Sequence, residues 1–179
     1  VLDARLQQYG KNFADCVSML FSIHYLFNDL NNISMLLENV SKVLHKNGVF
    51  IVATLDGPSV FNALKKSTNN IISGKVYDHK TEKYVEVWKI RADPDLDLTA
   101  PILPNTIKDG FNNNIHVTIE SIGQELQESL VHPSLLISLA ASAGLELINH
   151  NTLHKQFNLF NKSTGLFSDI YTKYTKLNP

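Results

Sequence analysis

The side chains with the clearest chemical potential lie in the nine residues 19–27, which read MLFSIHYLF. His24 and Tyr25 follow a short apolar run, where packing alone favours aliphatic side chains. An imidazole and a phenol flanked by Phe21 and Phe27 can form a slot for a flat, polar, aromatic ligand such as a purine. The alternative is a core histidine with satisfied hydrogen bonds beside a packing tyrosine, and this stretch alone leaves both interpretations open.

A strand, a helix and a second strand are predicted around this stretch. Residues 13–21 form an apolar run typical of a buried strand. Between residues 31 and 45, apolar side chains recur every three or four positions, which predicts an amphipathic helix. Residues 49–54 are apolar and mostly β-branched, as in a strand that is buried on both faces of a parallel sheet. The three segments therefore predict a right-handed βαβ unit.

Turn and cap residues set the expected limits of these elements. Asn28 and Asn31 are the candidates for the N-cap of the first helix, and Asn47 with Gly48 is expected to end it. Asp56 and Gly57 then form a predicted turn before a helix at residues 59–66. In open α/β sheets the ligand lies beyond the carboxyl ends of the strands, which here are residues 21–27 and 54–58.

The remainder of the chain mixes predicted strands and helices. The patterns indicate strands at 75–77, 84–90 and 115–119, a helix at 133–143 ended by Gly144, a strand at 145–149, a helix at 154–161 and a closing strand at 170–177. Together with the βαβ unit, these elements predict an α/β fold.

Composition limits the class of protein. The chain has 179 residues, 44% of them hydrophobic and 18% charged, with a formal net charge of −1. This length suits one domain, and the charge argues against a wholly basic nucleic-acid binder, although a local basic groove is compatible with it. No apolar run approaches the length of a membrane span and no signal peptide opens the chain, so we expect no membrane partner.

The single cysteine and the first residue carry two further expectations. Cys16 lies in an apolar run and cannot form an internal disulfide, so we expect a buried thiol in a reducing compartment. One cysteine without paired histidines at helical spacing makes a structural zinc site improbable, and we expect no metal. Because the chain begins with Val1 rather than Met, we interpret it as the C-terminal part of a longer domain.

Four elements, in order along the chain, resemble the mRNA cap guanine-N7 methyltransferases. They are FSIHYLF at residues 21–27, KNGVFIVATLDG at 46–57, Glu128-Ser-Leu-Val131 before the helix that ends at Gly144, and Ile170-Tyr171. The resemblance covers nearly the whole chain and is poorest at residues 60–112. The Asp-Gly form of the second element and a long insertion at about residues 67–114 resemble the capping enzymes of large cytoplasmic DNA viruses of poxvirus or asfarvirus type.

The resemblance implies a Rossmann-like class I fold that binds S-adenosylmethionine. This would be the C-terminal portion, with a mixed, mostly parallel sheet and helices on both faces, and residues 1–179 would be part of a single methyltransferase domain. Asp3, Leu20, Phe21 and Ser22 would line the methyl donor. Leu20 replaces the glutamine usual in the family, so a contact there would come from backbone or apolar surface. The family's Gly-rich motif is absent, since Gly10 is the one glycine before residue 48.

By the same resemblance, His24, Tyr25, Glu128 and Tyr171 would line the pocket for the cap guanine. Guanine N7 already carries an in-plane lone pair, so we expect no general base and no catalytic side chain in the strict sense. Positioning of the two reactants would supply much of the acceleration. A carboxylate at Glu128 would accept from the base and become more favourable as the purine gains positive charge, while aromatic faces would stack on it.

The implied function is methyl transfer from S-adenosylmethionine to the 5′ cap guanine of viral mRNA, within a multifunctional capping enzyme. The implied partners are capped mRNA and other capping domains or a stimulatory subunit, and the implied location is the host cytoplasm or the virion. Two alternatives remain open: a catalytically silent methyltransferase-like subunit of a capping complex, and a different small-molecule methyltransferase. The sequence upstream of this chain would discriminate them, because an intact Gly-rich motif supports the enzyme.

Overall fold

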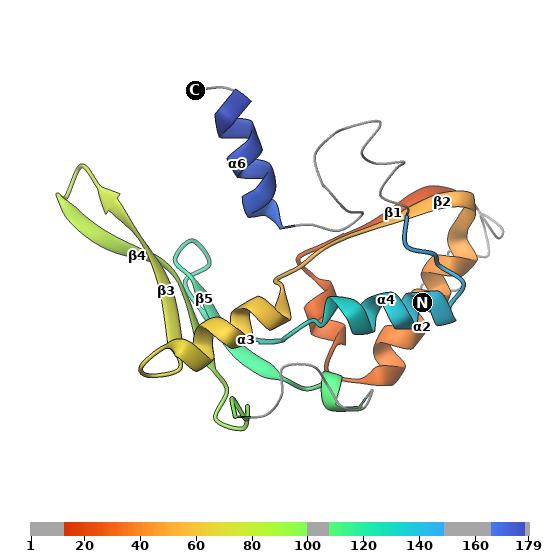
Figure 1. The fold of residues 1–179 in the computed structure, drawn as a ribbon, viewed down its shortest axis with the longest axis horizontal. Helices are drawn as coiled ribbons and strands as arrows, with labels where there is room; N and C mark the ends of the chain where they lie inside the picture. Colours follow the sequence, from red (N-terminus) through yellow and green to blue (C-terminus); the bar gives the residue numbers. More distant parts are fainter. Residues whose placement is uncertain (1–12, 100–107, 149–165, 178–179) are drawn as a thin grey trace.

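A computed structural model describes residues 13–99, 108–148 and 166–177 of the chain. The described part is elongated (Figure 1), with the first strands and their helices at one end and a long hairpin projecting from the other. The predicted α/β class is confirmed, because the described strands form one parallel pair and one antiparallel sheet flanked by helices.

The predicted βαβ unit is confirmed. Strand β1 (Ala14–Leu20) pairs in parallel with β2 (Leu44–Ala53), and α2 (Leu30–Val43) connects them. Side chains of β1, β2, α2 and α4 bury a first core, centred on Ile23, Phe27, Ile33, Leu37, Val131 and Leu135. This core holds the segment after β1 in place.

The predicted range of the first helix, residues 31–45, is close to that of α2, but its predicted N-cap and stop residues were wrong. The N-cap is Asp29, whose side chain accepts from the backbone N–H of Asn31 at 3.1 Å, instead of Asn28 or Asn31. The helix ends at Val43 rather than at the Asn47–Gly48 pair, and β2 begins directly at Leu44. Asn47 still turns the backbone, with φ of 69°, but it does so inside the strand, near an irregularity in the pairing with β1.

Helix α3 (Gly57–Lys66) begins two residues earlier than predicted, because Asp56 is its N-cap rather than part of a free turn. The Asp56 carboxylate accepts from the backbone N–H of Ser59 at 2.7 Å. Gly57 donates its own N–H to the carbonyl oxygen of Val131 at 3.0 Å. The start of α3 is therefore fixed to the segment that leads into α4.

Four strands form the antiparallel sheet in the order β3–β4–β5–β6, with bounds Ile71–Asp78, Lys83–Ala92, Asn114–Ile119 and Glu125–Ser129. The first three confirm predicted strands, whereas β6 was not predicted. One face of this sheet packs on α3 and forms a second core of Phe61, Leu64, Ile90, Ala92, Ile115, Val117 and Leu130. Residues 67–114, expected to be an insertion, thus contribute β3, β4 and the start of β5 to this sheet.

The C-terminal elements differ from the prediction. Helix α4 (Pro133–Ser142) is confirmed, and Gly144 follows it with φ of 82°. The strand predicted at 145–149 is wrong for residues 145–148, which lie in no strand, and the helix predicted at 154–161 lies outside the described residues. The predicted closing strand is wrong as well, since Phe167–Leu177 forms helix α6. Apolar residues at positions 167, 170, 174 and 177 follow the helical period, which prevails over the β-branched residues between them.

The expectation of a buried Cys16 is wrong, because its side chain is exposed. Helices α2 and α4 both pack on the face of the β1–β2 pair that carries Met19, Phe50 and Val52. Cys16 belongs to the other face, where Leu20 and Ile51 are exposed by 59% and 47%. An apolar run therefore did not imply burial on both faces here.

Candidate functional site

The site begins with a sharp change of direction at the carboxyl end of β1. Phe21 has φ of 50°, and its N–H donates to the carbonyl oxygen of Ala53 at 2.7 Å. A 3-10 helix, η1 (Ile23–Leu26), follows at once. Because Ile23 and Phe27 are fully buried in the first core, η1 cannot rotate, and His24 is held between them.

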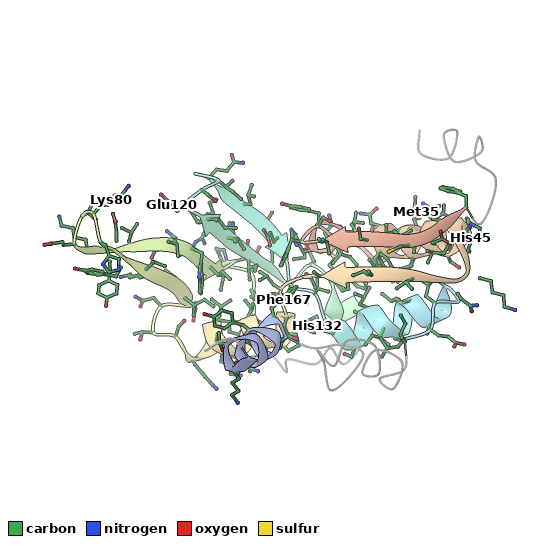
Figure 2. All side chains as sticks on the ribbon, turned by 90° about the horizontal axis from the view of Figure 1, so that it is seen from above. Met35, His45, Lys80, Glu120, His132 and Phe167 are labelled. Atoms are coloured by element: carbon green, nitrogen blue, oxygen red, sulfur yellow. The ribbon has the colours of Figure 1, made fainter. Side chains whose placement is uncertain are left out.

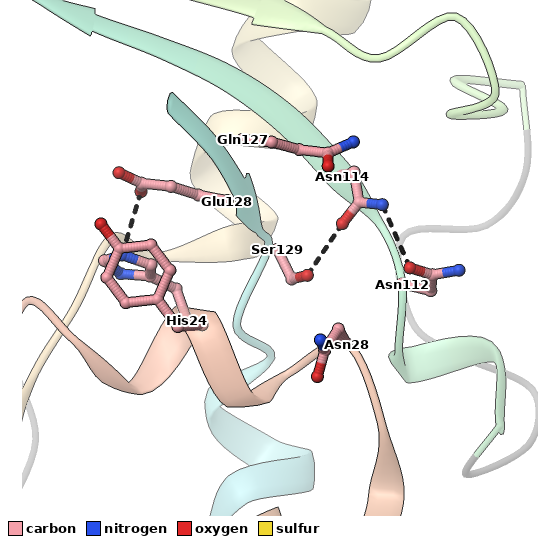
Figure 3. Close-up of a pocket in the computed structure, with 8 residues that line it drawn as sticks. His24, Asn28, Asn112, Asn114, Gln127, Glu128 and Ser129 are labelled. Atoms are coloured by element: carbon pink, nitrogen blue, oxygen red, sulfur yellow. Dashed lines mark hydrogen bonds and ion pairs between the residues drawn. The ribbon is translucent and has the colours of Figure 1, made fainter. Parts of the chain in front are cut away.

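A cavity of about 230 Å³ opens where η1 meets β6. Eight residues line it: His24, Tyr25, Asn28, Asn112, Asn114, Gln127, Glu128 and Ser129. The first three come from η1 and the residues after it, and the other five from β5, β6 and the loop before β5 (Figure 3). The cavity therefore joins the βαβ unit to the antiparallel sheet. Its lining contains no lysine and no arginine.

His24 and Glu128 face each other across one end of this cavity. The His24 Nε2 atom lies 3.6 Å from Glu128 Oε2, and the two side chains are exposed by only 7% and 10%. This distance is too long for a hydrogen bond. Neither ring nitrogen of His24 has a hydrogen-bond partner among the described residues. Such a buried and unsatisfied imidazole is costly unless a ligand supplies the missing partner.

Burial moves the pKa values of both groups toward their neutral forms. Desolvation lowers the pKa of the His24 imidazole and raises the pKa of the Glu128 carboxyl. An established ion pair would shift each pKa in the opposite direction. At 3.6 Å the two groups are close enough to attract each other, but the directions of both pKa shifts indicate that desolvation outweighs this attraction. We therefore describe His24 as a neutral imidazole beside a carboxylate that protonates more readily than usual.

Tyr25 lies on the solvent-exposed side of the same end of the cavity. Its ring lies edge-on to the His24 ring, with centroids 4.2 Å apart, and its side chain is about half exposed. Together these two rings leave an aromatic surface beside the carboxylate. A flat ring that enters here can contact the tyrosine and reach the polar atoms of His24 and Glu128 with its edge.

Neutral polar side chains line the other end, and none of them was predicted from the sequence as a site residue. Ser129 Oγ donates to Asn114 Oδ1 at 2.8 Å, and Asn114 Nδ2 donates to Asn112 Oδ1 at 3.1 Å (Figure 3). Gln127 Nε2 donates to Asp93 at 3.1 Å. The run of three asparagines at 112–114 was a visible signal, but asparagine is common in this sequence, and the strand that places Gln127 and Ser129 was not predicted.

The residues expected to line the methyl donor lie together at the end of β1, apart from Asp3, which is outside the described residues. Leu20 and Phe21 are exposed by 59% and 54%, and Ser22 is partly buried. The Phe21 ring stacks on that of Phe167 in α6, with centroids 6.2 Å apart. They form an apolar surface next to η1.

The structure places Tyr171 away from the expected strand. It lies on α6, its side chain is 70% exposed, and it is not among the residues that line the cavity. The structure thus brings His24, Tyr25 and Glu128 together and leaves Tyr171 apart from them.

Two other kinds of feature, a metal centre and a membrane-spanning helix, concern the described residues as a whole. These residues contain no group of three or more His, Cys, Asp or Glu side chains placed to hold a metal ion. Within the same residues, no helix is both long and apolar enough to span a membrane.

Two comparisons connect this geometry to known proteins. The model of the mRNA (guanine-N(7))-methyltransferase domain family matches residues 1–173. A curated protein described as a probable mRNA-capping enzyme of Acanthamoeba polyphaga mimivirus is 28% identical over 167 residues, which are 91% of this chain and 13% of that protein. The chain therefore corresponds to a small part of that relative. The mixed α/β arrangement agrees with the Rossmann-like methyltransferase fold expected from the sequence.

Proposed function

Because the chain belongs to the family of mRNA (guanine-N(7))-methyltransferase domains, we propose that it forms the guanine-binding part of a site that methylates N7 of an RNA cap. The methyl donor in this proposal is S-adenosylmethionine. The substrate is RNA that ends in an unmethylated 5′ guanosine cap. The wider setting, a multifunctional viral capping enzyme acting in the host cytoplasm, is part of the same proposal. The mimivirus relative, described as a probable mRNA-capping enzyme, supports its capping role.

The observation that carries the proposal is the unsatisfied pair at the closed end of the cavity. His24 has two buried ring nitrogens without partners among the described residues, and the Glu128 carboxylate lies 3.6 Å away. A guanine edge offers two donors, N1–H and the exocyclic amino group, beside an acceptor, O6. The carboxylate accepts from the donors, and a neutral imidazole can donate to the acceptor.

The reaction requires no proton transfer by these residues. Guanine N7 has a lone pair in the ring plane and loses no proton when it gains a methyl group, so no side chain need act as a base. His24, Tyr25 and Glu128 instead hold the base in one orientation, which is the part of catalysis that positioning provides. As the purine becomes cationic, the buried carboxylate of Glu128 and the ring of Tyr25 stabilise the developing charge.

The exposed end of β1 fits the methyl donor. When bound, S-adenosylmethionine supplies a methyl group on a positively charged sulfur. Leu20 and Phe21 present apolar and aromatic surface directly before His24, and Ser22 adds a hydroxyl. These residues would pack against the apolar parts of the donor and exclude water next to the guanine edge. Asp3 remains a proposed contact of the same ligand.

Tyr171 stays in the proposal as a contact of the capped end made from α6. Phe167 on the same helix stacks on Phe21, which fixes α6 near the end of β1. The exposed phenol of Tyr171 is therefore available to a ligand rather than committed to packing.

The test is methyl transfer by the full-length protein from labelled S-adenosylmethionine to RNA that starts with unmethylated GpppA. We expect label at N7 of the terminal guanine, identified by nuclease digestion and chromatography. Label on another acceptor with none on the cap would refute the proposal. Cap binding without any transfer would favour the alternative, a silent methyltransferase-like subunit of a capping complex.

A further inference from the structure

The hairpin formed by β3 and β4 extends well beyond the sheet to which it belongs. Strand β5 pairs with β4 only at residues 88–92, so residues 75–86 form a two-stranded projection. Figures 1 and 2 show it leaving the body of the molecule, with Lys80 at its tip. An isolated two-stranded hairpin gains little stability from its own backbone pairing. Interactions of its side chains must therefore stabilise this projection.

Aromatic rings gather near the tip of this hairpin. Tyr77 and Tyr84 are cross-strand partners with ring centroids 5.3 Å apart, and the His79 ring lies 5.1 Å from that of Tyr77. Such a pair stabilises a hairpin. Tyr84 nevertheless remains 72% exposed and Tyr77 40%, so much of their ring surface faces solvent.

The hairpin also differs in charge from the rest of the chain. Residues 71–92 carry a net charge of +2, whereas the whole chain carries −1. The rest of the chain therefore carries a net charge of −3. The projecting residues 75–86 supply three lysines, Lys75, Lys80 and Lys83, balanced by three carboxylates, and the excess comes from Lys89 and Arg91 at the base of the hairpin. Lysines beside exposed aromatic rings suit single-stranded nucleic acid, because the ammonium groups attract phosphates while bases stack on the rings.

We propose that the β3–β4 hairpin binds the single-stranded RNA that follows the cap, with Tyr77 and Tyr84 as stacking platforms. This inference rests on the proposed function, which makes capped RNA the substrate. It adds an RNA-binding surface outside the guanine cavity. The cavity itself has no lysine or arginine in its lining, so it does not provide for the phosphates of a longer RNA.

The distance between the two sites fixes the length of RNA required. Through the strand pairing, Glu128 lies level with Ile115 and therefore with Ala92. Tyr84 is eight residues before Ala92 on β4, and a strand rises by about 3.4 Å per residue, which gives about 27 Å. Stacked nucleotides at about 3.4 Å each would cover this with about eight nucleotides.

The experiment compares two substrates of the full-length protein: the cap dinucleotide GpppA and a GpppA-capped RNA of roughly twice the length needed to reach the hairpin. We expect the Tyr77→Thr/Tyr84→Thr double variant to raise KM for the long RNA by about five- to tenfold. The KM for GpppA should be unchanged, since that ligand cannot reach the tip. Threonine retains strand propensity, so the backbone of the hairpin is preserved.

Two control variants separate ring stacking from loss of the hairpin. Val76→Thr removes a side chain that is 57% exposed and points to the opposite face from its neighbour Tyr77, and it should leave both KM values unchanged. Tyr84→Phe keeps the ring and should also behave like the wild type. Equal KM values of the double variant and the wild type for long RNA would overturn the proposal, and so would an equal loss for GpppA.

Fluorescence anisotropy with uncapped single-stranded RNA tests the hairpin independently of methylation. We expect the double variant to bind this RNA about five- to tenfold more weakly than the wild type, with an affinity that falls as salt is raised. If the wild type failed to methylate GpppA but showed this difference, the proposed function would fail and the RNA-binding surface would remain. Unchanged RNA affinity with loss of a protein partner would instead assign the hairpin to protein docking.

Discussion

The two halves of the molecule bury their apolar residues in separate cores that meet at two consecutive residues. Leu130 belongs to the core beneath the antiparallel sheet, and Val131 to the core beneath the β1–β2 pair. The βαβ unit is built from neighbours in sequence, although Val131 and Leu135 complete its core, whereas the antiparallel half brings β6 back to η1 across about a hundred residues. The cavity lies at this junction, with lining residues from both halves.

The contrast shows which contacts the site depends on. The spacing of His24 from Glu128 requires the two halves to be held in one relative position. The Leu130–Val131 segment and the hydrogen bond from Gly57 to the carbonyl oxygen of Val131 provide that connection. Changes inside the cavity and changes at the junction should therefore differ in whether stability falls together with activity.

The largest effect is expected from Glu128→Ala in the full-length protein. Removing the carboxylate that faces the guanine edge should lower kcat/KM for cap methylation by at least about 100-fold, the usual loss when one stabilising group in a preorganised site is removed. Thermal unfolding should show little destabilisation, because burial disfavours the charged form of this carboxyl in the folded state. The rate of methyl transfer to GpppA checks the effect on activity, and a thermal melting curve checks the effect on stability.

Glu125→Ala is the matched control on the same strand. Glu125 lies outside the cavity lining and makes an exposed ion pair with Arg91 at 2.8 Å. Exposed pairs contribute little, so cap methylation should stay within about twofold of the wild type. Wild-type rates in Glu128→Ala, or equal losses in both variants, would remove Glu128 from the site.

The two halves also differ in how far the sequence predicts them. The βαβ unit has local determinants, the apolar period of α2 and the β-branched run of β2, and both were found. The contact between Glu128 and His24 could not be predicted from the spacing of residues along the chain. It depends on β6, which is only five residues long, and on the pairing of β6 with β5. The resemblance to a family supplied this pairing of residues where periodicity could not.

The incorrect predictions also concern features that a local sequence pattern does not determine. Asp29 rather than a neighbouring asparagine caps α2, a choice between similar caps that side-chain geometry decides. Cys16 is exposed because both covering helices lie on the other face of its strand. The amide side chains of the cavity are positioned by pairing between β5 and β6, so no local pattern identified them.

A smaller effect, on stability first, is expected from Gly57→Ala at the junction. A methyl group at Gly57 would overlap the backbone carbonyl of Val131, which cannot move as a side chain can. Overpacking of this kind costs about 1–3 kcal/mol, which corresponds to a fall of about 2–12 °C in Tm for a domain of this size. Cap methylation should fall as well, because the two halves shift relative to each other.

Gly74→Ala is the counterpart in the hairpin. There the added methyl would meet the indole of Trp88, a partly exposed side chain that can rotate away. We expect a smaller fall in Tm and unchanged methylation of GpppA. If Gly74→Ala affected methylation of GpppA as strongly as Gly57→Ala, the junction would have no special role in holding the cavity.

The smallest effect concerns pH and separates binding from stability. The pKa of Glu128 is raised by burial, and guanine binding requires its ionised form. Affinity for GpppA should therefore be full above this raised pKa and fall by up to about tenfold per pH unit below it. Binding measured by anisotropy or calorimetry in Glu128→Gln should be weak and independent of pH across this window.

Stability should respond much less than binding in the same window, because two linkage contributions oppose each other. The raised pKa of Glu128 means that the folded state gains stability as pH falls and this carboxyl becomes protonated. The lowered pKa of His24 means that the folded state loses stability as pH falls through the ordinary histidine range, since only the unfolded chain then readily takes up the proton. A Tm that fell in parallel with GpppA affinity would show that the pH effect reflects unfolding rather than titration of Glu128 in the cavity.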